Sequence, residues 1–473
     1  MTARRHAMSL AVALLALRLA SAQPLPLAAG QPLWQQRYDA YGTMLVRSMA
    51  AAPFPHPARA DGYRYGGQLY SAADCYSDNR VAVFVPEGFR AGATVDAIVH
   101  CHGWRGKLEE LLPRYLLAEQ LVASRRNAVL IVPQGPRGAP DSFAGRLEEP
   151  GGFSRLMAEV LALLREQAVV GPDCALGRII LSAHSGGGRA VARMLEVGGL
   201  SQQVREVWLF DAMYGMADRY LAWWDQQQGR LVSLYTVGGG TLGQNEALMA
   251  QLTARRTPLL ALRDDEAAPA WPRSHQPVFV LTSLAHDDVM TARNTFRALA
   301  ESSLLDPVPP PDGPPHLRAA WQLLNALDPT DTYYRHGAPD VLFGPRPHLY
   351  ADCSGFVDAL YAKAYGWTAA QFEGAFGSAR PTARRLYDGI VAGRLLREVR
   401  DLRTAQPGDL LAAKFLDPSD NTGHVMLVAG RPRRVPDTAP TQPGTEQWAV
   451  PIIDSTRACH ALWRRDLSPS GCA

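Results

Sequence analysis

The chain has 473 residues, of which 47% are hydrophobic and 20% are charged, and its formal net charge is +3 at pH 7. A single hydrophobic core rarely grows beyond about 250–300 residues, so this length predicts two domains. The ordinary composition excludes a disordered or fibrous protein. Because no run rich in Lys and Arg stands out, nucleic acid is not an expected partner.

Residues 1–22 are typical of a secretion signal. A basic start precedes an apolar stretch that is too short to span a bilayer, and Ala20-Ser21-Ala22 is typical of a cleavage site. The alternatives are an N-terminal anchor or a cytosolic leader. No run of about 20 apolar residues follows, so we expect export to the periplasm or the exterior without stable membrane insertion.

The proline-rich stretch at residues 306–315, DPVPPPDGPP, divides the chain. Such a stretch continues neither a helix nor a central strand and behaves as a semi-rigid extended linker. It predicts an N-terminal domain over residues 23–305 and a C-terminal domain over residues 316–473. A second proline-rich stretch, residues 431–444, is expected to form a long loop between two strands.

Short apolar strands alternate with amphipathic helices in the N-terminal domain. The predicted strands cover residues 81–86, 96–101, 128–133, 178–183, 206–210, 232–237 and 277–282. The predicted helices cover residues 111–125, 153–167 and 187–199. This alternation predicts an α/β fold, in which a parallel sheet is covered by helices on both faces.

The C-terminal domain has a different order of elements. Helical patterns come first, at residues 353–397, and short strands follow at residues 409–415, 424–429 and 449–454. This order predicts a smaller, compact α+β domain.

Ser185 is the candidate nucleophile of the N-terminal domain. The strand RIILSA runs into His184-Ser185-Gly186-Gly187-Gly188 and then into a predicted helix. Such a turn needs small neighbours, because it holds the serine in a strained conformation and lifts its hydroxyl above the sheet. The pattern alone fits a plain glycine-rich turn equally well.

A serine hydroxyl is a weak nucleophile that needs a histidine base, and a carboxylate must fix the tautomer of that base. His286 follows the last predicted strand, and Asp211 ends the strand after the serine turn. The rival acids are Asp264, Asp265 and Glu266. They are not expected at a strand end, so Asp211 is the preferred acid.

Four other polar residues near these positions are expected to have supporting roles. His102 and His184 adjoin the predicted oxyanion loop and the nucleophile, where histidines usually support local structure. Asp287 and Asp288 follow the candidate base and are expected to cap the next helix.

The strand DAIVHC ends in His102-Gly103-Trp104, which places backbone N–H groups where an oxyanion hole would form. Gly186, directly after the nucleophile, is the expected second contributor. With these motifs and the order Ser, Asp, His, residues 80–300 resemble the α/β-hydrolase family. The resemblance implies a serine hydrolase that uses neither a metal nor a cofactor.

Cys353 is the candidate nucleophile of the C-terminal domain. It opens the predicted helix of DCSGFVDALYAKAYG, where the helix N-terminus stabilises a thiolate. His424 begins a strand, and Asp454 ends the next one. A cysteine on a helix, a histidine on an adjoining strand and a polar residue on the following strand form the papain-like arrangement. The alternative is a buried structural cysteine.

The motifs DCSGFV, PGDLL and GHVMLVAG closely resemble the NlpC-type cysteine peptidase family, over about residues 316–460. The resemblance implies a bacterial enzyme that hydrolyses peptide or amide bonds of the peptidoglycan stem. It also implies that Cys353 is the nucleophile, His424 the base and Asp454 the orienting group.

The same resemblance implies that Asp352 and Ser354 hold the amino end of the substrate and that Tyr350 contributes to the oxyanion site. The third catalytic residue has an alternative. His460 replaces Asp454 if the register of the last strand slips.

The sequence therefore predicts an exported bifunctional hydrolase whose partner is peptidoglycan or a cell-wall peptide. The serine domain is expected to act on an ester or amide. Two other interpretations compete: a cell-wall-binding protein with only one active domain, and an N-terminal lipase or acyltransferase unrelated to the wall. An apolar lid in residues 238–275 would favour a lipid substrate, but that stretch is mixed.

The chain has six cysteines, namely Cys75, Cys101, Cys174, Cys353, Cys459 and Cys472. Export would permit disulfides, and the last two make the easiest pair because they are close in sequence. No C-x-x-C spacing occurs, which argues against structural zinc.

Overall fold

The computed structural model describes residues 32–39, 41–267, 275–309, 313–327, 331–344, 346–415, 422–434 and 445–456. The predicted secretion signal, the predicted Cys459–Cys472 pair and His460 lie outside these residues. Within the described residues, no helix is both long and apolar enough to cross a membrane.

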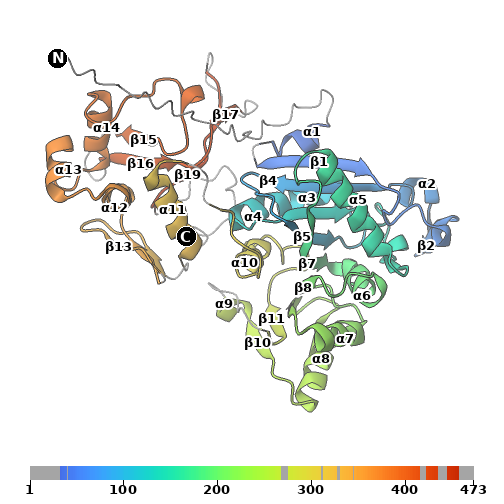
Figure 1. The fold of residues 1–473 in the computed structure, drawn as a ribbon. Helices are drawn as coiled ribbons and strands as arrows, with labels where there is room; N and C mark the ends of the chain where they lie inside the picture. The colour runs from blue at the N-terminus through green and yellow to red at the C-terminus, as the bar shows by residue number, and fades with distance from the viewer. Residues whose placement is uncertain are drawn as a thin grey trace, which may run out of the picture.

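A nine-stranded sheet organises the N-terminal half (Figure 1). Its strand order is β1 (Gly42–Ser48), β4 (Arg80–Pro86), β6 (Val129–Pro133), β5 (Thr94–Cys101), β7 (Ala175–His184), β8 (Val204–Phe210), β9 (Arg230–Thr236), β11 (Val278–Thr282) and β10 (Leu260–Arg263). Only β4 runs in the opposite direction to the other eight strands, so its pairings with β1 and β6 are antiparallel and the remaining pairings are parallel. The seven predicted strands are therefore confirmed within a few residues, whereas β1 and β10 were missed.

Helices cover both faces of this sheet, as predicted. One face packs against α3 (Leu108–Tyr115), α4 (Leu117–Ser124) and α10 (Thr295–Glu301). The other packs against α5 (Gly152–Glu166), α6 (Gly188–Val197), α7 (Ala217–Gln227) and α8 (Leu242–Ala254). The single helix predicted over residues 111–125 is wrong. The backbone breaks at Leu116, which has a φ of +51°, directly after a helix that contains Pro113.

The alternation of side chains along each strand builds two cores from one sheet. In β4, Val81 and Val83 pack toward α5, whereas Ala82 and Phe84 pack toward α3 and α4. A fully buried apolar side chain of this size stabilises the fold by about 1.5–3 kcal/mol. Burial on both faces explains why these strands are continuous apolar runs.

The loops that follow the parallel strands emerge at one edge of the sheet. The register pairs His184 at the end of β7 with Phe210 at the end of β8. It also pairs Thr236 of β9 with Thr282 of β11. The residues that follow these four positions therefore meet at the same edge.

The C-terminal half is a smaller unit of helices and short sheets, drawn from yellow to red in Figure 1. Its helices are α11 (Pro315–Ala326), α12 (Cys353–Tyr365), α13 (Ala369–Phe376) and α14 (Ala383–Val391). An antiparallel sheet has the order β15 (Leu410–Lys414), β16 (Gly423–Val428) and β19 (Ile452–Ile453). The predicted order of helices before strands agrees with these elements.

Several short elements of this half were not predicted. They are α11, the three-stranded sheet of β12 (Thr332–Tyr333), β14 (His348–Tyr350) and β13 (Asp340–Leu342), and the two-stranded sheet of β17 (Arg433–Arg434) and β18 (Trp448–Ala449). The last pair brackets the second proline-rich stretch, of which residues 435–444 lie outside the described chain.

The beginning of the predicted linker is bound to the α/β sheet domain. The amide of Asn127 donates to the carbonyl of Asp306 at 2.8 Å, and the amide of Val308 donates to the carbonyl of Arg125 at 2.7 Å. The guanidinium of Arg125 also lies 3.3 Å from the ring centre of Trp321 in α11. Arg125 of the N-terminal half therefore contacts both the start of the predicted linker and the first helix of the C-terminal half.

Candidate active sites

Ser185 lies at a sharp turn between β7 and α6. It has a φ of +54°, in the left-handed region that residues other than glycine rarely adopt. The turn requires glycines on its far side, because a Cβ on Gly187 would lie 2.1 Å from the carbonyl oxygen of Cys101. Backbone strain of this kind is typical of a nucleophile elbow.

Asp211 and His286 reach this turn from β8, which adjoins β7, and from β11, which lies on the far side of β9. Asp211 directly follows β8, and His286 lies four residues beyond the end of β11. Nδ1 of His286 lies 2.6 Å from Oδ2 of Asp211. The carboxylate side chain is fully buried, whereas the imidazole side chain is 33% exposed, so the base remains open to a substrate.

Three donors besides the imidazole hold the Asp211 carboxylate. Oδ2 accepts from Oγ1 of Thr236 at 2.8 Å, and Oδ1 accepts from the Thr236 amide at 3.3 Å and from Oγ1 of Thr241. Burial raises the pKa of Asp211, but the hydrogen bonds from His286, Thr241 and Thr236 outweigh burial and hold the pKa below its ordinary value. Asp211 is therefore ionised at neutral pH.

The rival acids have other partners. The expectation that they are not at a strand end is wrong, because β10 ends at Arg263, immediately before Asp264. Asp264 nevertheless accepts from Oγ1 of Thr282 and lies 3.3 Å from Arg293. Glu266 accepts from the amide of Arg263 at 2.7 Å. The Asp265 side chain lies outside the described structure.

His184 supports the loop that carries the candidate base. Nε2 of His184 lies 2.9 Å from the backbone carbonyl of His286, and Nδ1 lies 3.3 Å from the Tyr115 hydroxyl. Burial lowers the pKa of His184 to about 4. The ring is therefore neutral at pH 7, and its Nε2–H donates to the carbonyl.

The two aspartates after His286 do not cap a helix, so that prediction is wrong. Asp287 pairs with Arg114 at 2.8 Å. The backbone carbonyl of Asp288 accepts from the amides of Thr291 and Ala292 in a turn that precedes α10. The helix α10 begins at Thr295 with Asn294 as its N-cap, and no side chain forms a capping hydrogen bond there.

The predicted oxyanion segments are brought against the nucleophile. A Cβ on Gly103 would lie 2.5 Å from Cβ and 3.0 Å from Oγ of Ser185. A Cβ on Gly186 would lie 2.8 Å from Cδ1 of Trp104. Gly103 therefore lies directly against the Ser185 side chain, and the Trp104 side chain packs on Gly186, so both predicted segments adjoin the nucleophile.

His102 holds the first of these segments in place. Its Nε2 accepts from the amide of Gly135 at 2.8 Å, and its Nδ1 lies 2.7 Å from the carbonyl of Gly103. Because Nε2 accepts, Nδ1 carries the proton and donates to Gly103. Burial lowers the pKa of His102, which keeps the ring neutral.

Cys353, His424 and Asp454 form the second cluster. Cys353 is the first residue of α12, and His424 lies on β16, which packs against that helix. Nε2 of His424 lies 2.6 Å from Oδ2 of Asp454. The hydrogen bonds with Asp454 and with Cys353 raise the pKa of His424 to about 9. The three side chains are therefore linked in the order Asp, His, Cys.

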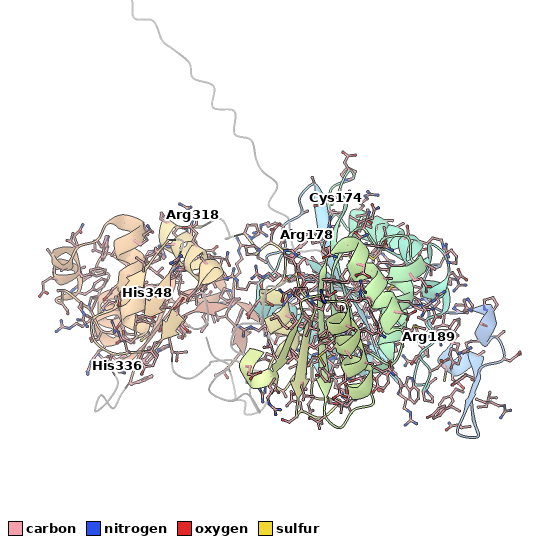
Figure 2. The ribbon with its side chains drawn as sticks, turned by 90° about the horizontal axis from the view of Figure 1, so that it is seen from below. Cys174, Arg178, Arg189, Arg318, His336 and His348 are labelled. Atoms are coloured by element: carbon pink, nitrogen blue, oxygen red, sulfur yellow. The ribbon has the colours of Figure 1, made fainter. Side chains whose placement is uncertain are left out.

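The predicted substrate-binding residues lie beside this cluster. Asp352 is the N-cap of α12, where it accepts from the Gly355 amide at 2.8 Å and from Oγ of Ser354 at 3.0 Å. His336, labelled in Figure 2, lies 3.1 Å from the same carboxylate. Tyr350 stacks on His348, with ring centres 4.7 Å apart.

The other described cysteines are buried free thiols, namely Cys75, Cys101 and Cys174. Among the described residues, no group of three His, Cys, Asp or Glu side chains is arranged to hold a metal ion. The structure brings together Ser185, Asp211 and His286, and it also brings together Cys353, His424 and Asp454. The catalytic role of each of these residues stays a prediction.

Sequence analysis missed three residues of the serine site: Thr236, Thr241 and Tyr214. The threonines hold Asp211, and the Tyr214 ring lies edge to face against the His286 ring, with centres 6.4 Å apart. The glycine-rich segment after β9 was the available signal. A Cβ on Gly239 would lie 2.3 Å from Oδ2 of Asp211, so this segment closes around the carboxylate.

The strand order and the serine turn show that the N-terminal half has the α/β-hydrolase fold. The solved structures similar to the chain include a ferulic acid esterase, with 12% identity over 47% of this chain and 91% of that chain and a TM-score of 0.34. They also include the S-formylglutathione hydrolase FrmB of Staphylococcus aureus, with 12% identity over 55% and 98% and a TM-score of 0.33. The enterobactin hydrolase IroE has 15% identity over 57% and 99% and a TM-score of 0.31.

No protein-family model matches the chain. Among curated proteins, the uncharacterized protein R653 of Acanthamoeba polyphaga mimivirus is similar to it, with 31% identity over 152 residues. The match covers 29% of this chain and 67% of the viral protein. At this identity and coverage, the chain belongs to the same family as mimivirus R653.

Proposed function

We propose that the N-terminal domain is a serine hydrolase that cleaves an ester or amide through an acyl-enzyme. The observation that carries this proposal is the 2.6 Å contact between His286 and the buried Asp211, beside a serine held at a φ of +54°. A strained serine, a histidine and a buried carboxylate at strand ends on one edge of the sheet are the parts that acyl transfer needs.

Each side chain has a defined task in this reaction. Asp211 keeps the proton of the resting imidazole on Nδ1, which leaves Nε2 of His286 free to accept the proton of Ser185. The serine oxygen then bonds to the substrate carbonyl carbon, and the peptide groups at Gly103 and Gly186 stabilise the oxyanion. His286 returns the proton to the leaving group, and water repeats the sequence to release the acid.

Exposed apolar side chains around this site indicate a substrate with an apolar or ring-bearing part. Trp104 is 47% exposed, Tyr65 44%, Tyr214 47% and Val237 56%. The rings of Tyr65 and Trp104 pack edge to face with centres 5.2 Å apart. Large apolar groups that remain exposed at the mouth of a polar site commonly contact ligand.

A second function is proposed for the C-terminal domain, which we infer to be a cysteine peptidase. The supporting observation is the linked set of Asp454, His424 and Cys353, with a pKa of about 9 at the histidine. A protonated imidazole beside a thiol at a helix N-terminus stabilises the thiolate. The likeness of its motifs to NlpC-type peptidases favours a peptide bond of the peptidoglycan stem as the substrate.

Both proposals fit an exported protein that acts on the cell wall. Export and peptidoglycan as the shared partner rest on the leader-like residues 1–22 and on the motif around Cys353. If both domains meet the same polymer, the serine domain acts on an ester or amide attached to it.

Paired variants test the two functions separately. Ser185→Ala is expected to abolish turnover of a short-chain p-nitrophenyl ester while release of stem peptides from purified peptidoglycan continues. Cys353→Ser is expected to do the reverse, because a serine hydroxyl is far less ionised than a thiol. Loss of both activities in either variant would show one active site rather than two, and wild-type protein without ester turnover would contradict the serine hydrolase.

A further inference from the structure

A two-stranded hairpin carries an exposed tyrosine to the edge of the serine site. Its strands are β2 (Tyr63–Tyr65) and β3 (Gln68–Tyr70), and they are joined by Gly66 and Gly67, with φ values of +57° and +81°. Two positive φ values in a two-residue loop make a tight hairpin turn, which glycine adopts without strain. Tyr65 is the last residue before this turn, so it lies at the tip of the hairpin.

The two faces of this hairpin have different surroundings. Tyr63 and Tyr70 are paired across the strands and pack against a buried cluster around Phe54. Because side chains alternate along a strand, Tyr65 shares this inner face, whereas Leu69 belongs to the outer face and is 46% exposed. The inner face therefore anchors the hairpin and holds Tyr65 in a fixed place.

Tyr65 and Trp104 together form an aromatic corner beside the nucleophile. Their ring centres are 5.2 Å apart, with an angle of 72° between the planes, and the side chains are 44% and 47% exposed. A Cβ on Gly186, the residue after Ser185, would lie 2.8 Å from Cδ1 of Trp104. The polar atom of the Trp104 side chain, Nε1, donates to Oγ of Ser142 at 2.8 Å, so the exposed part of its ring is apolar.

The aromatic corner and the base pack on opposite flanks of the nucleophile. The His286 ring packs on that of His184, the residue before Ser185, with centres 4.7 Å apart. Trp104 packs instead on Gly186, the residue after the nucleophile. Since His286 must deliver its proton to the leaving atom, the alcohol part of an ester lies on the His286 side. The acyl part is the other substituent of the carbonyl carbon, so it is directed toward the aromatic corner.

We propose that the aromatic corner of Tyr65 and Trp104 binds the acyl part of the substrate and that this part carries a planar aromatic ring. The inference rests on the proposed serine hydrolase and adds the class of acid to it. A planar ring can lie on the face of one ring of the corner while its edge meets the other, which are the arrangements that aromatic rings prefer. Because Trp104 touches Gly186, the ring is joined to the carbonyl carbon directly or through a short chain.

The test compares methyl esters of three acids, so that the leaving group stays constant. Methyl 3-phenylpropanoate carries the planar ring, methyl 3-cyclohexylpropanoate has the same carbon skeleton with a saturated ring, and methyl acetate is the reference. Turnover is followed by pH-stat, and each kcat/KM is divided by that of the same variant on methyl acetate. The wild type is expected to prefer the phenyl ester to the cyclohexyl ester.

Tyr65→Leu keeps an apolar side chain at the tip of the hairpin but removes the ring. The normalised kcat/KM of this variant is expected to fall about fivefold for the phenyl ester, as the loss of one aromatic pair implies, and less than about twofold for the cyclohexyl ester. Leu69→Ala is the matched control, because Leu69 is similarly exposed on the same hairpin but belongs to its outer face. Both normalised values are expected to stay the same in the control.

Benzyl acetate separates the acyl side of the site from the alcohol side, because it carries its ring on the leaving group. Its turnover relative to methyl acetate is expected to change less than about twofold in Tyr65→Leu. A loss in this variant that is larger for benzyl acetate than for the phenylpropanoate ester would overturn the assignment to the acyl part.

The other outcomes separate this inference from the proposed function. A loss in Tyr65→Leu that is confined to the phenylpropanoate ester supports the aromatic corner. Equal losses on the phenyl and cyclohexyl esters, no loss on either, or the same loss in Leu69→Ala overturn it while leaving the serine hydrolase in place. Wild-type protein that turns over none of the four esters contradicts the serine hydrolase and the aromatic corner together.

Discussion

Replacement of Asp211 by asparagine tests whether this carboxylate orients His286. One carboxylate oxygen of Asp211 faces the backbone amide of Thr236 at 3.3 Å. A backbone amide can only donate, so the asparagine must keep its oxygen at that position. Its NH2 group is then forced toward Nδ1 of His286, where the other carboxylate oxygen lies at 2.6 Å.

The cost of this replacement follows from the proton position. An NH2 group facing Nδ1 of His286 requires that nitrogen to be unprotonated, so the ring carries its proton on Nε2 and cannot accept the proton of Ser185. Flipping the amide would leave the buried Thr236 N–H without an acceptor, at about 1–3 kcal/mol, which is roughly a tenfold to hundredfold preference against the flip. The same substitution in serine proteases lowers kcat by about 10⁴, or about 5 kcal/mol.

The assay is turnover of a short-chain p-nitrophenyl ester, with Tm as the measure of folding. Asp211→Asn is expected to lose about 10³ to 10⁴ in kcat with little change in Tm, because Oγ1 of Thr236 can accept from the new NH2 group. Asp264→Asn is the matched control. It is also a buried aspartate after a strand of the same sheet, but its side chain pairs with Thr282 and Arg293. Near wild-type turnover in Asp211→Asn, or an equal loss in Asp264→Asn, would refute the assignment.

Two further predictions concern the other elements of the sites. Gly103→Ala places a Cβ 2.5 Å from Cβ of Ser185, which would displace the oxyanion segment. We therefore expect ester turnover to fall by at least about tenfold. An unchanged kcat would show that this segment is not part of the site. The pKa of His424 is raised to about 9 in the folded protein, above its ordinary value of about 6.5. The protonated imidazole therefore stabilises the fold fully below about pH 6.5, and this stabilisation is lost as the pH rises through 9. Asp454→Asn should therefore lower Tm more at pH 6 than at pH 9.5, and a loss that is the same at both pH values would contradict the pairing.

Much of the fold could be predicted because the strands are buried on both faces. Continuous apolar runs such as 81–86 and 128–133 predict such strands, and both are present within a residue of each end. The strand β10 was missed because Leu260–Arg263 is only four residues long and alternates between half-buried and exposed positions. A short edge strand has little hydrophobic signal of its own.

The candidate site could be located from strand ends, but its supporting contacts could not. Ser185, Asp211 and His286 each follow an apolar run, so a parallel sheet brings them to one edge. Thr241 and Tyr214 reach the same place through loops. Their positions depend on the left-handed backbone of Asp211, at φ +47°, and on how closely the glycine-rich segment packs. Neither property has a periodic signature in the sequence.

The covalent modification of Ser185 by a fluorophosphonate tests the central claim most directly. Tandem mass spectrometry of the labelled, folded protein would identify the modified residue. A hydrolase in which His286 activates Ser185 is expected to carry one phosphonyl group on Ser185, and Ser185→Ala should remain unlabelled under the same conditions. Wild-type protein that stays unmodified, or that is labelled at another residue, would contradict the proposed serine hydrolase.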